Sequence, residues 1–81
     1  MRTTNLIEGL QILQKYYDKP DGFHVGAEHD AIYAYATDRP VELEDIKKLI
    51  ALDWFQENVE YEDDDFLPEH YDPKESWTAY V

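Results

Sequence analysis

The residues best suited to chemistry in this sequence form a small cluster near the middle of its N-terminal half. His24, Glu28, His29 and Asp30 lie within seven positions of one another. Imidazole and carboxylate groups are the usual ligands of zinc and non-haem iron, and they also act as general bases. One interpretation is therefore a small metal-dependent enzyme or metal sensor that uses His24, His29 and Asp30.

A second interpretation makes the same residues an ordinary turn. His24 and His29 are five positions apart, so on an extended chain their side chains point to opposite faces. A His-Asp pair is common in turns, where the aspartate bonds nearby backbone donors. We favour the turn, and we expect no metal, no cofactor and no catalytic residue at this place.

Acidic residues crowd the segment from 57 to 75, with a run at Asp63, Asp64 and Asp65. A dedicated calcium loop alternates its oxygen ligands around a central glycine and ends with a glutamate. That spacing is absent, so we expect only weak cation binding. The sequence also lacks a nucleophile elbow and a phosphate-binding glycine loop, and we predict that the protein is not an enzyme.

The overall charge limits the choice of partner. The chain has 19 Asp and Glu against 7 Lys and Arg, which gives a net charge of −12. This charge repels nucleic-acid phosphates and anionic membranes, so we expect neither direct nucleic-acid binding nor membrane association. A protein partner with a basic surface is expected instead. Carboxylates spread over the surface would then stand in for phosphates, as in a nucleic-acid mimic.

The length and composition indicate one small folded domain. At 81 residues, with 43% hydrophobic residues, residues 1–81 are expected to form a single acidic domain with a loop-rich segment from 56 to 75. The chain has no cysteine, and we find no apolar run long enough for a membrane span and no signal peptide. We therefore expect a cytoplasmic protein, and its oligomeric state is left open.

Hydrophobic periodicity predicts an α+β fold. One helix is expected from Asn5 to Tyr17, with Asn5 as its N-cap and Gly9 allowing close approach of a neighbour. A second is expected from Glu42 to Leu52, burying Leu43 and exposing Asp45. A hairpin and a final strand from Ser76 to Val81 complete the order α-β-β-α-(β)-β. The prediction is a three- to four-stranded antiparallel sheet with both helices packed on one face.

The hairpin register decides which residues are exposed. If Ala27 faces Ala31, Tyr33 and Tyr35 share a face with Phe23; if Ala27 pairs with Ile32, they do not. We favour the second register. It puts Phe23 and Val25 under the helices and leaves His24, Tyr33, Tyr35 and also Tyr80 on the other face. The interaction candidates are Tyr33, Tyr35, Glu60, Glu62, Asp63, Asp64 and Asp65.

Several short motifs resemble those of small uncharacterised acidic proteins encoded by bacteria and phages. They are the hairpin motif Ala27-Glu28-His29-Asp30-Ala31-Ile32-Tyr33, the helix end Leu49-Ile50-Ala51-Leu52-Asp53-Trp54 and the closing Ser76-Trp77-Thr78. The resemblance covers most of the chain and implies no established activity. From the charge and the tyrosines we predict a small protein-interaction module that docks on a basic protein surface as a nucleic-acid mimic or as a phage or bacterial regulator.

Overall fold

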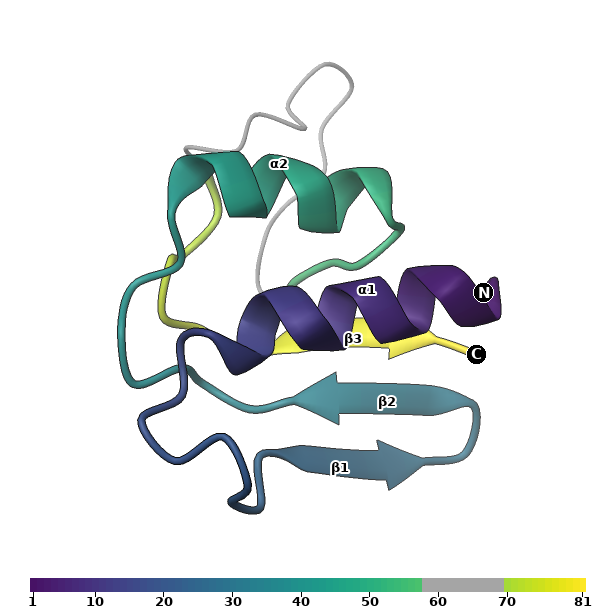
Figure 1. The fold of residues 1–81 in the computed structure, drawn as a ribbon. Coiled ribbons are helices and arrows are strands. Elements are labelled where there is room, and N and C mark those ends of the chain that lie inside the picture. The colour runs from purple at the N-terminus through teal and green to yellow at the C-terminus, as the bar shows by residue number, and fades with distance from the viewer. Residues whose placement is uncertain (58–69) are drawn as a thin grey trace.

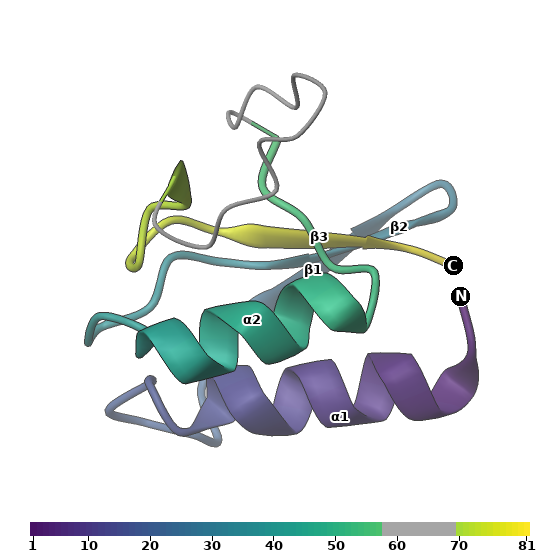
Figure 2. The same cartoon turned by 90° about the horizontal axis from the view of Figure 1, so that it is seen from above.

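Two helices lie on one face of a three-stranded antiparallel sheet (Figure 1). The computed structural model describes residues 1–57 and 70–81. Figure 2 shows both helices on the same side of the sheet. This confirms the predicted α+β class. The elements are α1 (Thr3–Gln14), β1 (Val25–Glu28), β2 (Ala31–Ala34), α2 (Leu43–Ala51) and β3 (Trp77–Tyr80).

The strands follow the order β1-β2-β3, with β2 in the centre. Ala27 pairs with Ile32, so the favoured hairpin register is confirmed. The ladder continues as far as Glu28 and Ala31, which leaves His29 and Asp30 as the connecting turn. His29 has a φ of 53°, in the left-handed region that histidine enters more readily than most residues.

The outer edge of β3 is paired by a single bridge instead of a fourth strand in the residues described. The Phe55 amide donates to the Thr78 carbonyl at 3.0 Å, and the Thr78 amide donates back at 2.7 Å. Next along the chain, the buried Gln56 side chain bonds both the amide and the carbonyl of Asp72. The ring of Tyr71 stacks on Trp77, with centroids 5.2 Å apart. Both ends of the segment predicted to be loop-rich are therefore anchored to the core.

The core lies between the sheet and the two helices. Gly9 of α1 lies directly against Trp54, which follows α2, because a Cβ built at Gly9 would overlap the Trp54 indole. The Trp54 Nε1 donates to the Asn5 carbonyl at 3.1 Å. The close approach predicted at Gly9 is confirmed. The fully buried hydrophobic side chains are Leu13, Ala34, Leu49, Trp54, Trp77 and Ala79.

The ends of α1 differ from the prediction. The helix starts at Thr3, its N-cap is Arg2, and no side chain caps it, so the proposed Asn5 cap is wrong. Asn5 lies inside the helix. The helix also stops at Gln14, three residues early, because the amides of Tyr16 and Tyr17 bond carbonyls three residues back. Such bonds tighten the last turn into a 3₁₀-like connection.

Three exposure predictions are wrong for identifiable reasons. Phe23 is fully exposed because it precedes β1 and takes no part in the strand alternation. Val25 lies on the helix side of the sheet but is half exposed, because β1 is an edge strand with no partner on its outer side among the residues described. Leu43 is also half exposed, because it is the first residue of α2 and only the later turns reach the core.

A fourth exposure prediction is also wrong. Asp45 is buried, although the sequence pattern places it on the solvated side of the second helix. It is 5% exposed. It accepts a hydrogen bond from the Tyr16 hydroxyl and one from the Lys15 ammonium at 2.8 Å. Lys48 lies 3.8 Å from its other oxygen. This carboxylate therefore ties the end of α1 to the start of α2, whereas Glu44 pairs with Lys47 on the surface of α2.

The Asp45 cluster gives folding stability a defined pH dependence. Burial raises the pKa of the Asp45 carboxyl, but hydrogen bonds from Lys15 and Tyr16 outweigh it and hold the pKa below its usual range. Its contribution is therefore present above the unfolded pKa of about 4 and is lost as the pH falls below it. Burial and the bond to Asp45 raise the pKa of Tyr16 to about 12. That contribution is present below about pH 10 and is lost as the pH rises towards 12.

We predict that Tyr16→Phe lowers the free energy of unfolding by about 1.5–3 kcal/mol at neutral pH, because it removes a hydrogen bond to a buried charge. It should also move acid unfolding to a higher pH. Urea unfolding at several pH values measures both effects. The matched control is Tyr80→Phe at an exposed tyrosine, expected within about 0.5 kcal/mol of the wild type. Equal acid midpoints for Tyr16→Phe and the wild type would contradict the role given to the cluster.

Candidate functional site

The sheet face that carries neither helix presents a group of aromatic and acidic residues. Paired residues of neighbouring strands lie on the same face, so Gly26, Tyr33 and Thr78 share it. Tyr80 lies diagonal to Tyr33 across the β2–β3 pair, and Tyr35 follows two positions after Tyr33. We call this surface the tyrosine face and define it by Glu28, Asp30, Tyr33, Tyr35, Phe55, Glu57 and Tyr80.

The tyrosine face combines exposed tyrosine rings with packed residues that hold them in place. Tyr80 is 58% exposed and Tyr35 is 50% exposed. The Tyr80 ring packs on Phe55 with centroids 5.1 Å apart, and Thr78 is buried on this face. Rings held in place in this way lose little conformational freedom when a partner covers them.

The charges of three carboxylates act on Tyr33, the central tyrosine of this face. Partial burial raises the pKa of the Tyr33 hydroxyl, and the charges of Glu57, Glu28 and Asp30 raise it further. These three acids come from the end of β1, from the turn and from the chain beside β3. Folding therefore gathers separate acidic residues into one negative field around a ring that keeps its proton at neutral pH.

Tyr35 is positioned by two contacts on opposite sides of the hairpin. Its hydroxyl lies over Gly26, where any Cβ would overlap it. Its carbonyl accepts a hydrogen bond from the buried Tyr17 hydroxyl. Gly26 thus leaves room for Tyr35 to lie across the neighbouring strand, and both Tyr33 and Tyr35 lie on the face that the favoured register gives them.

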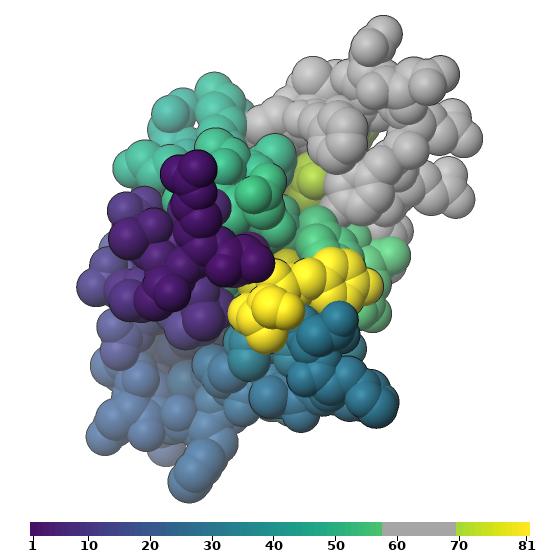
Figure 3. Space-filling view, turned by 90° about the vertical axis from the view of Figure 1, so that its right-hand side faces the viewer, coloured from purple at the N-terminus to yellow at the C-terminus, as the bar shows by residue number. Residues whose placement is uncertain are grey.

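The C-terminal residues lie against the hairpin turn at one end of this face. The Val81 amide donates to the Asp30 carbonyl at 2.7 Å. In Figure 3 the C-terminal residues, in yellow, lie next to the blue hairpin and the purple N-terminus. Glu28, Asp30 and Tyr80 therefore form one continuous end of the tyrosine face.

The ion pairs of the described residues lie away from this face. Lys47 pairs with Glu44 at 3.3 Å, Arg39 with Asp18 at 3.5 Å, and Lys15 with Asp45. These basic groups belong to α2, the loop before α2 and the end of α1. No ion pair within residues 1–57 and 70–81 involves Glu28, Asp30 or Glu57.

The histidine cluster considered from the sequence is not brought together. His24 stacks on Tyr17 with ring centroids 4.0 Å apart, and a ring nitrogen contacts the Lys19 carbonyl. Its predicted place on the open face is therefore wrong, because the Tyr17 ring holds it on the α1 side. His29 is in the turn at the far end of β1, about 16 Å away for an extended chain. The described part of the chain holds no group of three or more His, Asp or Glu side chains arranged to bind a metal.

Some residues of the tyrosine face were predictable and others were not. Strand alternation alone indicates Tyr80 as a companion of Tyr33. Phe55 and Glu57 carry no such signal, because their position depends on the bridge to Thr78. The remaining sequence candidates, Glu60, Glu62, Asp63, Asp64 and Asp65, lie outside the described residues and stay predictions.

Comparisons with known proteins add no family to this description. No protein-family model, no curated protein and no solved structure matches the chain. Among the residues described, neither helix has the length and apolar character that crossing a membrane requires.

Proposed function

We propose that this protein is a small acidic interaction module that docks on a basic protein surface through its tyrosine face. One observation carries the proposal: tyrosine rings and three carboxylates share the sheet face without helices, and none of these carboxylates has an ion-pair partner among the described residues. The net charge of −12 extends the same field over the whole chain.

The chemistry of the face suits arginine-rich partners in particular. A guanidinium group can bond a carboxylate with two parallel hydrogen bonds and can also stack on an aromatic ring. Tyr80 and Tyr35 offer exposed rings, and Glu28, Asp30 and Glu57 lie close enough to Tyr33 to affect its hydroxyl. Rings and carboxylates therefore lie on one face, where an arginine-rich surface can contact both.

A surface that normally binds nucleic acid is the partner class we favour. Such surfaces carry Lys and Arg spaced to meet phosphates. An acidic protein that presents carboxylates to them acts as a nucleic-acid mimic and competes for the site. A regulator in a bacterium or phage would work in this way, in the cytoplasm and by contact, without a chemical step.

We predict that Asp30→Asn with Glu57→Gln weakens capture of basic proteins from a lysate at least about tenfold, or about 1.4 kcal/mol. Raising the salt from about 0.1 to 1 M should have a comparable effect on the wild type, because it shortens the Debye length from about 10 to 3 Å. The matched control is Glu8→Gln with Asp21→Asn, which removes the same charge at exposed positions outside the face.

The control variant should retain capture within about threefold of the wild type. Equal losses in the two double variants would show that only net charge matters, and would contradict docking through the tyrosine face. Capture that is insensitive to salt would contradict a basic partner altogether.

A further inference from the structure

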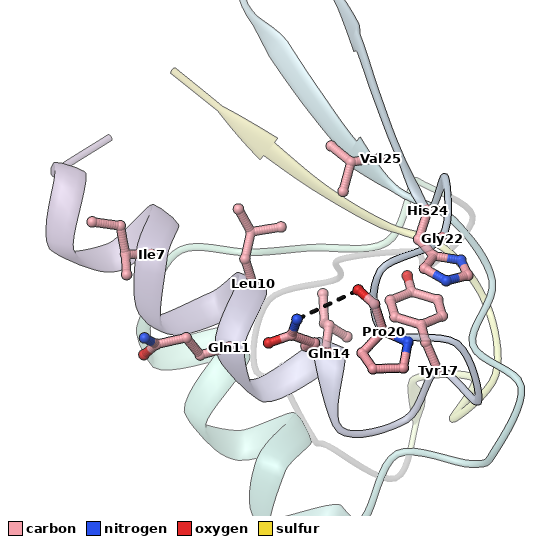
Figure 4. Close-up of a pocket in the computed structure, with 10 residues that line it drawn as sticks. Ile7, Leu10, Gln11, Gln14, Tyr17, Pro20, Gly22, His24 and Val25 are labelled. Atoms are coloured by element: carbon pink, nitrogen blue, oxygen red, sulfur yellow. Dashed lines mark hydrogen bonds between the residues drawn. The ribbon is translucent and has the colours of Figure 1, made fainter.

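An apolar groove lies on the opposite side of the hairpin, between α1 and β1. Its volume is about 290 Å³. Figure 4 shows Leu10 extending from α1 towards Val25, with the stacked rings of His24 and Tyr17 at one end. Among the described residues, those that line the groove include no lysine, arginine, aspartate or glutamate. Ile7 and Val25, each 49% exposed, contribute apolar surface to the groove.

The outer edge of β1, beside this groove, is unpaired in the described sheet. β1 is the first strand of the order β1-β2-β3. The Tyr35 amide donates to the His24 carbonyl, which makes this pair a hydrogen-bonded one. Hydrogen-bonded pairs alternate along an antiparallel ladder. Gly26 and Glu28 therefore also face β2, and the amides and carbonyls of Val25 and Ala27 point outward.

The edge and the groove are placed to act together on one extended segment. A strand added to β1 would receive main-chain hydrogen bonds from Val25 and Ala27. Its alternate side chains would fall on the helix side, over the groove lined by Leu10 and Val25. The side chains between them would fall on the other face, beside the exposed Glu28.

We propose that β1 accepts an extended segment of a protein partner in which apolar and basic residues alternate. The apolar side chains fill the groove between α1 and β1, and the basic side chains lie beside Glu28. This contact lies on the outer edge of β1 and shares only Glu28 with the tyrosine face.

Charge favours a basic partner over a second copy of the chain. Each copy carries a net charge of −12, so edge-to-edge pairing of two copies would bring two strongly negative bodies together. A segment with lysine or arginine at alternate positions reduces that field and meets Glu28 directly. The edge strand is also short, at four residues, which matches a brief peptide contact.

The probe for this site is the synthetic peptide KVRLKVR, compared with KKRRVVL, which has the same composition and charge without the alternation. Nitrogen-15 spectra of the whole protein report where each peptide binds. We expect KVRLKVR to bind at least about tenfold more tightly than KKRRVVL, and to slow hydrogen exchange at the amides of Val25 and Ala27.

Two substitutions test the groove and the edge separately. Ile7→Gln removes apolar surface from the groove, and Leu43→Gln is its control at an equally exposed helix position outside it. Ala27→Pro removes an outward-pointing amide and leaves the bonds to β2 in place. We expect at least about tenfold weaker peptide binding for Ile7→Gln and Ala27→Pro, and no change for Leu43→Gln or for Asp30→Asn with Glu57→Gln.

Three results would overturn the proposal. The first is equal binding of the two peptides with loss only in the Asp30→Asn, Glu57→Gln variant, which would mean that charge attracts them to the tyrosine face. The second is no binding of KVRLKVR by wild-type protein. The third is a dimer in sedimentation in which the amides of Val25 and Ala27 are already protected without peptide, which would make a second copy the occupant.

Discussion

Replacing Gly9 with valine is expected to lower the free energy of unfolding by about 3 kcal/mol, near the upper end of the range for overpacked cores. A side chain at Gly9 meets the Trp54 indole, which is fully buried and bonded to the Asn5 carbonyl. The indole therefore has little freedom to move aside. Valine also has a higher helix propensity than glycine, by a few tenths of a kcal/mol. The cost of the clash with Trp54 must therefore exceed this gain in helix propensity.

Urea unfolding of Gly9→Val, beside Gln11→Val as a control at an exposed position of α1, measures this effect. The control should change stability by less than about 0.5 kcal/mol. Adding Trp54→Phe to Gly9→Val should recover part of the loss, because the smaller ring vacates space near the helix. Additive losses in the double variant would contradict a direct clash between these two residues.

The second large effect concerns Trp77, the other fully buried tryptophan. Trp77→Ala is expected to cost about 3–5 kcal/mol, because it opens a cavity beneath the Tyr71 ring. A chain of this length has a total stability of roughly 4–12 kcal/mol, so this variant should be largely unfolded under mild conditions.

Trp77→Phe should cost much less than Trp54→Phe. The Trp77 Nε1 is buried and has no hydrogen-bond partner within the described chain. Phenylalanine at this position therefore removes the free-energy cost of burying an unpaired N–H group. Trp54→Phe instead loses the bond to the Asn5 carbonyl. We expect a difference of about 1–3 kcal/mol between the two phenylalanine variants in thermal or urea unfolding. Equal costs would show that the indole N–H groups contribute nothing to the contrast.

The fold was predictable where a local pattern and the global arrangement agree. Gly9 interrupts an apolar helix stripe, and the structure fills that space with Trp54. The hairpin register was predictable because pairing Ala27 with Ile32 places small residues under the helices, and Ala34 is fully buried. The sequence signal for each of these features is local, since it is an interrupted apolar stripe within one helix or the alternation within one hairpin.

The errors arose where a distant residue decides the outcome. Asp45 reads as a solvated helix residue, yet Lys15 and Tyr16, about thirty positions earlier, supply the bonds that permit its burial. His24 reads as an open-face residue, and the Tyr17 ring draws it to the other side. The hydrophobic periodicity of a single segment cannot predict contacts with residues of another segment.

The candidate site was predictable in part for the same reason. Tyr33, Tyr35 and Tyr80 follow from strand alternation, whereas Glu57 joins them only because Phe55 bridges to Thr78. The histidine cluster fails because β1 separates its two histidines along the strand. The site is therefore made of residues from all three strands and from the segments that follow β1, β2 and α2, in place of one local motif.

The most direct test of docking through the tyrosine face is the footprint of a captured basic partner on nitrogen-15-labelled protein. We predict that binding perturbs the amides of Glu28, Asp30, Tyr33, Glu57 and Tyr80, and leaves those on the outer surfaces of α1 and α2 unchanged. A footprint on the helices, with the residues of the tyrosine face unperturbed, would contradict the proposed function.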